Sequence, residues 1–204
     1  MVHVSQLGEE FFSQLLVLDA EISRRVAAAG CPWCGGPLHQ AHYQRKPRGG
    51  VVAAAGEAFS LRHSLCCGRR GCRRRALPPS LRFLGRRVYL EVVVVLASVV
   101  AQCVVALRAA STQTGVPART LKRWLCWWQQ VLPQLPWWAE LRALFMPPAP
   151  DEATLPRSLL DHLRRTVGGA HLAWLAAKCL APGTTSMGDA TRFVRDATAL
   201  PDLA

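Results

Sequence analysis

Two groups of cysteines have the spacing of a metal site. Cys31 and Cys34 are separated by two residues in the sequence Cys-Pro-Trp-Cys-Gly-Gly, and Cys66, Cys67 and Cys72 follow in a second group. Two thiolates at the first spacing can bind one ion while backbone N–H groups point at the sulfurs, and the following glycine permits the tight turn. We predict a Zn²⁺ site whose ligands are Cys31, Cys34, Cys67 and Cys72.

The second group leaves the choice of ligand open between Cys66 and Cys67. Neighbouring residues on a strand point to opposite faces, so only one of the two can face the metal, and we favour Cys67. The 32 residues between Cys34 and Cys67, and the four between Cys67 and Cys72, exceed the usual spacing of a zinc ribbon. Three histidines are near enough in sequence to replace a thiolate, although each is more often a surface or core residue: His39, His42 and His63.

The remaining cysteines and the first residues bear on the compartment. Residues 1–6 show no basic region followed by an apolar stretch, so no secretory signal is visible and we expect the reducing cytoplasm. In that compartment clustered cysteines are more often metal ligands than disulfides. Three further cysteines stand alone among apolar residues, and we expect them in the core: Cys103, Cys126 and Cys179.

The charge balance points to a polyanion. The chain has 25 Lys and Arg against 13 Asp and Glu, and its few lysines leave arginine, which suits bidentate phosphate and guanine contacts, as the main cation. Between Ile22 and Leu90, fourteen cations stand against one acid, Glu57. This excess predicts a nucleic acid or an anionic membrane surface as partner. Together with the helix-turn-helix described below, it leads us to predict double-stranded DNA. Seven arginines near the second cysteine group are the predicted phosphate contacts: Arg69, Arg70, Arg73, Arg74, Arg75, Arg86 and Arg87.

A helix and short strands are expected around the cysteines. Residues 8–28 place apolar side chains at spacings of three and four, which predicts an amphipathic helix that ends at Gly30. Residues 37–48 indicate a short strand, and alternating apolar and polar residues over 59–65 indicate a second, half-buried strand. Two strands that are each attached to a cysteine turn predict a zinc ribbon.

An apolar run over residues 92–107 is interrupted only by Ser98 and Gln102, and Glu91 precedes it. It is shorter than the roughly 20 residues that a membrane span needs. We therefore expect the central helix of a small helical domain, with no membrane as partner.

The residues after this run predict a helix-turn-helix. A short helix over 107–114 is followed by a turn at Gly115 and a second helix that begins at Pro117. In this motif the N-terminal exposed residues of the second helix meet DNA, while an ordinary antiparallel helix pair is the alternative. Val116, Leu121 and Trp124 are expected to face inward. The predicted DNA-contacting residues are Arg119, Lys122 and Arg123, with Thr120 as a phosphate contact.

The rest of the chain predicts more helix. Tryptophans at helical spacing beside leucines, over 124–138, are expected to be core residues rather than platforms for stacked bases. Pro147 opens a linker. Short helices are expected after it over residues 156–166, 170–180 and 187–199.

These elements predict a mainly α fold with a small β zinc ribbon. We expect the N-terminal helix and zinc ribbon within residues 1–79 and the helix-turn-helix domain within 80–146. A linker and short C-terminal helices would then occupy residues 147–204.

Three features together resemble a bacterial protein family. They are the Cys-Pro-Trp-Cys-Gly turn, the basic run from Gly71 to Tyr89, and the sequence Thr-Leu-Lys-Arg-Trp that ends at Trp124. Members of this family are similar to the zinc-ribbon and helix-turn-helix front ends of insertion-sequence transposases, over roughly residues 8–160. The resemblance implies DNA binding in an accessory or regulatory protein of a mobile element, or in a transcriptional regulator. An RNA-binding ribbon, or a non-catalytic subunit of a transposase or recombinase complex, is the alternative.

No catalytic pattern accompanies these modules. A metal-dependent transposase needs carboxylates that converge on two cations, and the acids after Trp124 are few and scattered. The only tyrosines are Tyr43 and Tyr89, both in the front half. We therefore predict no catalysis by this chain alone. A transposase or recombinase protein and a second copy of the chain, in a homodimer, remain open as partners.

Overall fold

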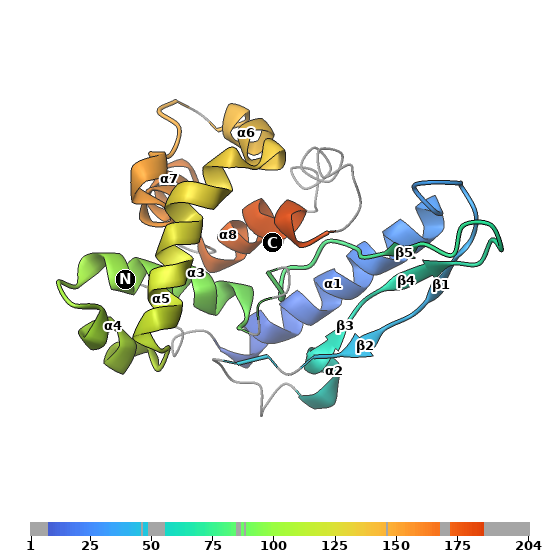
Figure 1. Cartoon of the computed structure of the whole chain (residues 1–204), viewed down its shortest axis with the longest axis horizontal. Helices are drawn as coiled ribbons and strands as arrows, with labels where there is room; N and C mark the ends of the chain where they lie inside the picture. Colours follow the sequence, from blue (N-terminus) through green and yellow to red (C-terminus); the bar gives the residue numbers. More distant parts are fainter. Residues whose placement is uncertain are drawn as a thin grey trace. The chain divides into compact units, whose positions relative to one another are not determined.

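The structure, a computed structural model, describes residues 8–45, 47–48, 56–84, 87, 89–145, 147–167 and 172–185. Within these ranges the chain is mainly helical with small antiparallel sheets, as predicted at this level (Figure 1). It divides into two compact units. We call the first the sheet unit, in which residues 8–90 are joined by residues 180–185, and the second the helical unit, Glu91–Cys179. The division falls after Leu90, whereas the sequence predicts a boundary after residue 79.

Helix α1, Glu9–Ala29, confirms the helix predicted over 8–28 and ends at Gly30. Its buried apolar residues recur at helical spacing on one face, so that face is the one that packs inward. They are Phe12, Leu15 and Ile22.

Two small antiparallel sheets form in the sheet unit. Strands β1 (Leu38–Gln40), β4 (Leu65–Cys67) and β5 (Arg75–Ala76) pair in the order β1-β4-β5, and β1 also contacts α1. Strands β2 (Tyr43–Gln44) and β3 (Leu61–Arg62) form the second sheet. Figure 1 shows α1 running beside β1, β4 and β5.

The register of the three-stranded sheet gives it an outward and an inward face. His39 pairs with Cys66, and Cys66 pairs with Arg75, so these three side chains share one face. They are exposed or half-buried, which makes this the outward face. On β4 and β5 the neighbouring residues point the other way and are buried: Leu65, Cys67 and Ala76.

The strand predicted over 59–65 is partly wrong. Residues up to Ser60 belong to a short helix, α2 (Gly56–Ser60), and only the residues after it are extended. Phe59 is buried, and its ring meets that of Phe12 in an edge-to-face contact with the centroids 5.7 Å apart. Packing against α1 therefore outweighs the local alternation of apolar and polar residues.

The helical unit begins with three helices that contact one another: α3 (Glu91–Cys103), α4 (Leu107–Thr114) and α5 (Ala118–Cys126). Residues 91–101 of α3 are buried on all sides, as expected for a central helix. Helix α5 continues through a π-helical turn, η2 (Trp127–Val131), into a 3-10 turn, η3 (Leu132–Gln134).

Further helices complete this unit: α6 (Pro136–Ala143), a 3-10 turn η4 (Glu152–Thr154), α7 (Arg157–Val167) and α8 (Leu172–Leu180), whose last residue belongs to the sheet unit. The two helices predicted over 156–166 and 170–180 are confirmed. The helix predicted over 187–199 lies outside the described residues. A last 3-10 turn, η5 (Ala181–Thr184), is part of the sheet unit.

The tryptophans and isolated cysteines of the helical unit, which are predicted to lie in the core, are buried only in part. Trp124, Trp128 and Trp138 are buried, as expected for core tryptophans, whereas Trp127 and Trp137 are half-buried. The prediction that the lone cysteines are buried is wrong for Cys103 and Cys126, which are exposed. Cys103 is the last residue of α3, beyond its buried segment. Cys126 lies four residues after the exposed Lys122 and shares that exposed side of α5.

Candidate functional site

Four cysteine sulfurs converge in the sheet unit. The Sγ atoms of Cys31 and Cys72 are 3.7 Å apart, those of Cys34 and Cys67 are 3.5 Å apart, and all four lie within 4.8 Å of one another. These thiols are free, and their separations are too long for disulfide bonds. Four sulfurs bound tetrahedrally at about 2.3 Å from one zinc ion would be about 3.8 Å apart. The spacing of this thiol cluster therefore suits one metal ion.

The first cysteine turn is closed by backbone hydrogen bonds. The N–H of Cys31 donates to the carbonyl of Gly36 at 2.9 Å, and the N–H of Gly35 donates to the carbonyl of Cys31 at 2.8 Å. A Cβ at Gly36 would lie 3.3 Å from the sulfur of Cys67 and 3.4 Å from that of Cys34. Glycine at this position therefore leaves room for the sulfurs.

The second cysteine turn begins at the end of β4. The N–H of Cys67 donates to the carbonyl of Arg74, and the N–H of Cys72 donates to the carbonyl of Arg69, both at 3.0 Å. The pairing of β1 with β4 brings this turn beside the first one, although a long loop separates them in sequence. The sheet thus assembles a site that the chain supplies in two halves.

Hydrogen bonds from backbone N–H groups lower the pKa values of the thiols in the cluster, whereas burial raises them. The N–H of Gly36 lowers the pKa of Cys34 to about 7. The N–H of Arg69 also lowers the pKa of Cys67, but burial and the neighbouring thiols together raise it to about 12. The N–H of Arg74 lowers the pKa of Cys72, but burial and the neighbouring thiols together raise it. A bound cation would remove this conflict, because it stabilises all the thiolates at once.

Of the two adjacent cysteines, Cys67 is the one in the thiol cluster. It is fully buried, whereas Cys66 lies on the outward face of the sheet, where its sulfur is 3.6 Å from the carbonyl oxygen of Arg73. Strand alternation, the basis for preferring Cys67, separates the two side chains here.

Among the described residues, the side chains that lie close enough together to hold a metal ion are the four cysteines of the thiol cluster, and no histidine is among them. His42 and His63 contact each other instead, edge to face, with ring centroids 4.8 Å apart. The N–H of Ser64 donates to Nδ1 of His42 at 3.1 Å. Burial, followed by the nearby charge of Arg82, lowers the pKa of His63 to about 4.

The predicted phosphate-contacting arginines of the second cysteine turn lie on the surface. All five are exposed: Arg69, Arg70, Arg73, Arg74 and Arg75. Arg87 is half-buried, and its carbonyl accepts a hydrogen bond of 2.8 Å from Nη2 of Arg45. Arg86 lies outside the described residues.

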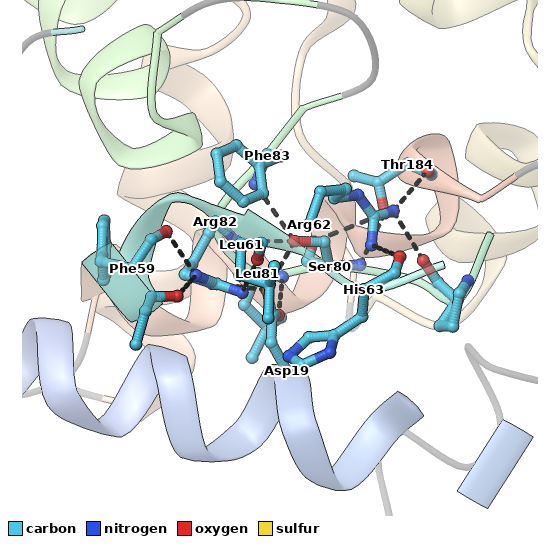
Figure 2. Close-up of polar contacts among 12 residues, drawn as sticks. Asp19, Phe59, Leu61, Arg62, His63, Ser80, Leu81, Arg82, Phe83 and Thr184 are labelled. Atoms are coloured by element: carbon cyan, nitrogen blue, oxygen red, sulfur yellow. Dashed lines mark hydrogen bonds and ion pairs between the residues drawn. The ribbon is translucent and has the colours of Figure 1, made fainter. Parts of the chain in front are cut away.

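Two other arginines of the basic segment are buried, which the sequence reasoning missed. Arg62 donates to the carbonyls of Pro78, at 2.7 Å, and Thr184, at 3.2 Å. Arg82 is fully buried and pairs with Asp19 of α1, with 2.7 Å between Nε and Oδ2. Figure 2 shows both guanidinium groups inside the sheet unit. These two cations therefore hold the fold together rather than meet a partner.

Asp19 is the centre of this buried network (Figure 2). Besides Arg82, its carboxylate accepts hydrogen bonds from the hydroxyl of Ser80, at 2.7 Å, and the N–H of Leu81, at 2.6 Å. Arg82 in turn donates to backbone carbonyls of α2 and β3. A signal was present in the sequence, because Asp19 falls four residues after Leu15 on the apolar face of the helix.

Helix α5 carries the second set of predicted contacts. It follows α4 after a tight turn in which Gly115 adopts φ 66° and donates its N–H to the carbonyl of Ser111 at 2.9 Å. The inward-facing residues are buried as expected: Val116, Leu121 and Trp124. Arg119, Lys122 and Arg123 are exposed along one stripe, and Thr120 is half-buried.

Comparison of the chain with protein-family models, curated proteins and solved structures found no match. None of the helices in the described ranges combines the length and the hydropathy that a membrane crossing requires.

Proposed function

We propose that this chain is a zinc-dependent DNA-binding protein that reads duplex DNA with helix α5. The observation that carries the proposal is the stripe of exposed cations on α5, opposite a buried apolar face and directly after a tight turn from α4. A short helix, a tight turn and a second helix are the parts of a helix-turn-helix, whose second helix enters the major groove, and their presence here supports the proposal.

The stripe has the chemistry of a DNA-reading helix. Arg119, Lys122 and Arg123 are spaced by three and four residues, so they project from the same side of α5. Arginine can bind the O6 and N7 atoms of guanine in the major groove, and lysine can bind phosphate or the same guanine edge. Thr120 would contribute a hydroxyl to a phosphate.

Zinc is the metal that best fits the thiol cluster. Four thiolates in a tetrahedral arrangement are typical of zinc or of iron–sulfur centres, and the sulfur spacing suits a single ion. Four protein ligands leave no open position for a substrate, so the role of zinc is structural. The sheet unit is then a zinc ribbon whose two turns are held together by the ion.

The ligand set is tested by two neighbouring serine substitutions. Cys67→Ser removes a sulfur from the thiol cluster and should abolish stoichiometric zinc, whereas Cys66→Ser changes the outward face and should leave the zinc content unchanged. Elemental analysis of the purified variants checks this. Equal zinc content in the two variants would contradict the proposed ligands.

DNA binding is tested by mobility shift, with duplexes selected from a random library, over a series of salt concentrations. Replacing Arg119 and Arg123 by alanine should weaken binding at least tenfold. If both contact phosphate, the slope of log K against log salt should also fall by about 2, because each phosphate contact contributes roughly 0.9. The matched control removes Arg164 and Arg165, two exposed arginines near the end of α7. Binding that is equally weakened by both double variants would refute a specific role of α5.

The biological role that fits these parts is an accessory or regulatory protein of a mobile element, or a transcriptional regulator. The resemblance to transposase front ends supports this assignment. A transposase or recombinase would be the partner protein, and a homodimer would place two copies of α5 on one duplex. We propose no catalytic activity, and strand cleavage by the pure protein with Mg²⁺ or Mn²⁺ would overturn that part.

A further inference from the structure

Two exposed aromatic side chains of the sheet unit each lie beneath an arginine. Trp33 is 39% exposed, and the guanidinium carbon of Arg74 is 5.6 Å from its ring centroid. Tyr43 is 38% exposed, and Arg75 lies 5.8 Å from its ring centroid in the same way. Both aromatics are among the few large hydrophobic side chains on the surface of the described residues. Neither contributes its ring to the core.

The two pairs are connected through neighbouring arginines. Trp33 belongs to the first cysteine turn and Tyr43 to β2, but their arginine partners are consecutive: Arg74 immediately precedes β5, and Arg75 is its first residue. Consecutive Cα atoms are about 3.8 Å apart, so the two pairs are linked through adjacent backbone positions that follow the second cysteine turn. Arg75 is also held in place, because Nη1 donates to the hydroxyl of Ser64 at 3.1 Å.

The surrounding surface is strongly positive. Arg69, Arg70 and Arg73 are exposed on the same turn as Arg74, and the salt bridges found among the described residues include none of these arginines. Arg69 is anchored by a hydrogen bond of 3.2 Å from Nη1 to the carbonyl of Cys34. Uncompensated cations beside exposed rings are suited to a ligand that offers both phosphates and flat aromatic groups.

We infer that this surface binds an unpaired nucleic-acid strand, with bases stacked on Trp33, Tyr43 and the guanidinium groups over them. In a duplex the faces of the bases are hidden within the stack, whereas an unpaired strand presents them to aromatic and arginine side chains. The exposed arginines neutralise the backbone. This site does not depend on duplex binding by α5, since none of its residues belongs to the helical unit.

The direct test is fluorescence anisotropy of labelled thymine and uracil oligonucleotides, about 12 nucleotides long, with the zinc-loaded full chain. Replacing Trp33 and Tyr43 by alanine should weaken binding at least about fivefold for each ring. Phenylalanine at both positions keeps the rings and should restore most of the affinity. A preference for thymine or uracil oligonucleotides identifies the source of the strand as DNA or RNA. Wild-type affinity in the alanine variant would overturn the inference.

Polyglutamate of matched charge is the competitor that tests the chemistry. If it displaces the oligonucleotide as well as an unlabelled strand does, the surface recognises charge alone and the inference fails. The α5 variant should lose duplex binding but keep oligonucleotide binding, and the aromatic variant should do the reverse, so the failure of either site is distinguished from that of the other.

A second measurement needs no substitution. Oligonucleotides that carry 5-iodouracil crosslink to stacked aromatic side chains on illumination, and peptide mapping of the wild-type adduct locates the residue. Crosslinks at Trp33 or Tyr43 support the inference even if the alanine variant fails to fold. Crosslinks confined to the tryptophans of the helical unit would overturn it.

Discussion

At the scale of single residues, the absence of a side chain at Gly36 leaves space beside the sulfurs of the thiol cluster. A methyl group there would come within 3.4 Å of two sulfurs and within 3.2 Å of Cβ of Arg69. We predict that Gly36→Ala lowers zinc affinity about tenfold, roughly 1.4 kcal/mol, because the sulfurs must move from their positions. Competition with a chromophoric chelator measures this.

The matched control for this substitution is Gly71→Ala, in the second cysteine turn. A Cβ at Gly71 meets nothing within 4 Å, so zinc affinity should be unchanged. If the two variants bind zinc equally, space at Gly36 is not what limits the site.

His63 makes the stability of the sheet unit depend on pH. Its pKa falls to about 4 in the folded protein because of burial, then the charges of Arg82, His42 and Arg62, which outweigh the opposite effect of Asp19. The unfolded chain binds a proton near pH 6.5, so stability contributed by this group is present above that pH and is lost as the pH falls toward 4. After allowing for solvent screening of a half-buried ring, we predict a loss of about 1–2 kcal/mol between pH 7 and pH 5.

The variant His63→Gln isolates this effect from the protonation of other groups. Urea denaturation of both proteins at pH 7 and pH 5 should show a smaller loss of unfolding free energy in the variant. An identical loss in both proteins would mean that His63 does not titrate in this range.

At the scale of elements, the ion pair between Asp19 and Arg82 ties α1 to the segment after β5. Removing the carboxylate leaves a buried guanidinium without its counter-ion and deprives Ser80 and Leu81 of an acceptor. We predict that Asp19→Ala lowers the unfolding free energy by about 3–5 kcal/mol, measured by urea denaturation.

Glu21→Ala provides the comparison on the same helix. Glu21 pairs with Arg24 and Arg25 at the surface, and such pairs contribute less than about 1 kcal/mol. A similar loss of unfolding free energy in the two variants would show that the buried pair of Asp19 and Arg82 stabilises the fold no more than a surface pair does.

At the scale of the whole molecule, we expect the two units to differ in their dependence on the proposed zinc ion. The thiol cluster lies in the sheet unit, and the helical unit has its own buried core, which includes most of α3 and three tryptophans. We predict that a chelator unfolds the sheet unit and leaves the helical unit folded, since binding of structural zinc commonly supplies the folding free energy of such small sites.

Hydrogen exchange measured by mass spectrometry separates the two responses. Peptides from residues 31–80 should lose protection when zinc is removed, while peptides from residues 91–141 should keep theirs. Simultaneous loss of protection in both sets would show that the units unfold as one.

Much of this protein follows from short-range patterns in its sequence. Apolar residues spaced by three and four predict helix α1, and cations spaced by three and four predict the exposed stripe of α5. The first cysteine turn is predicted by two cysteines three positions apart. Such features can be predicted because the interacting residues are neighbours along the chain, and local geometry alone places their side chains.

Tertiary structure decided what depends on distant residues. It placed Cys67 rather than Cys66 beside the first cysteine turn, and it buried Arg62 and Arg82 within a segment that composition marks as a uniform basic surface. It also made a helix of residues that alternate like a strand. For the two arginines and for α2, a contact with a part of the chain remote in sequence, such as Asp19 for Arg82, outweighs the local preference. For Cys67, strand alternation indicated that only one of two adjacent cysteines faces inward, and the pairing of β4 with β1 decided which one.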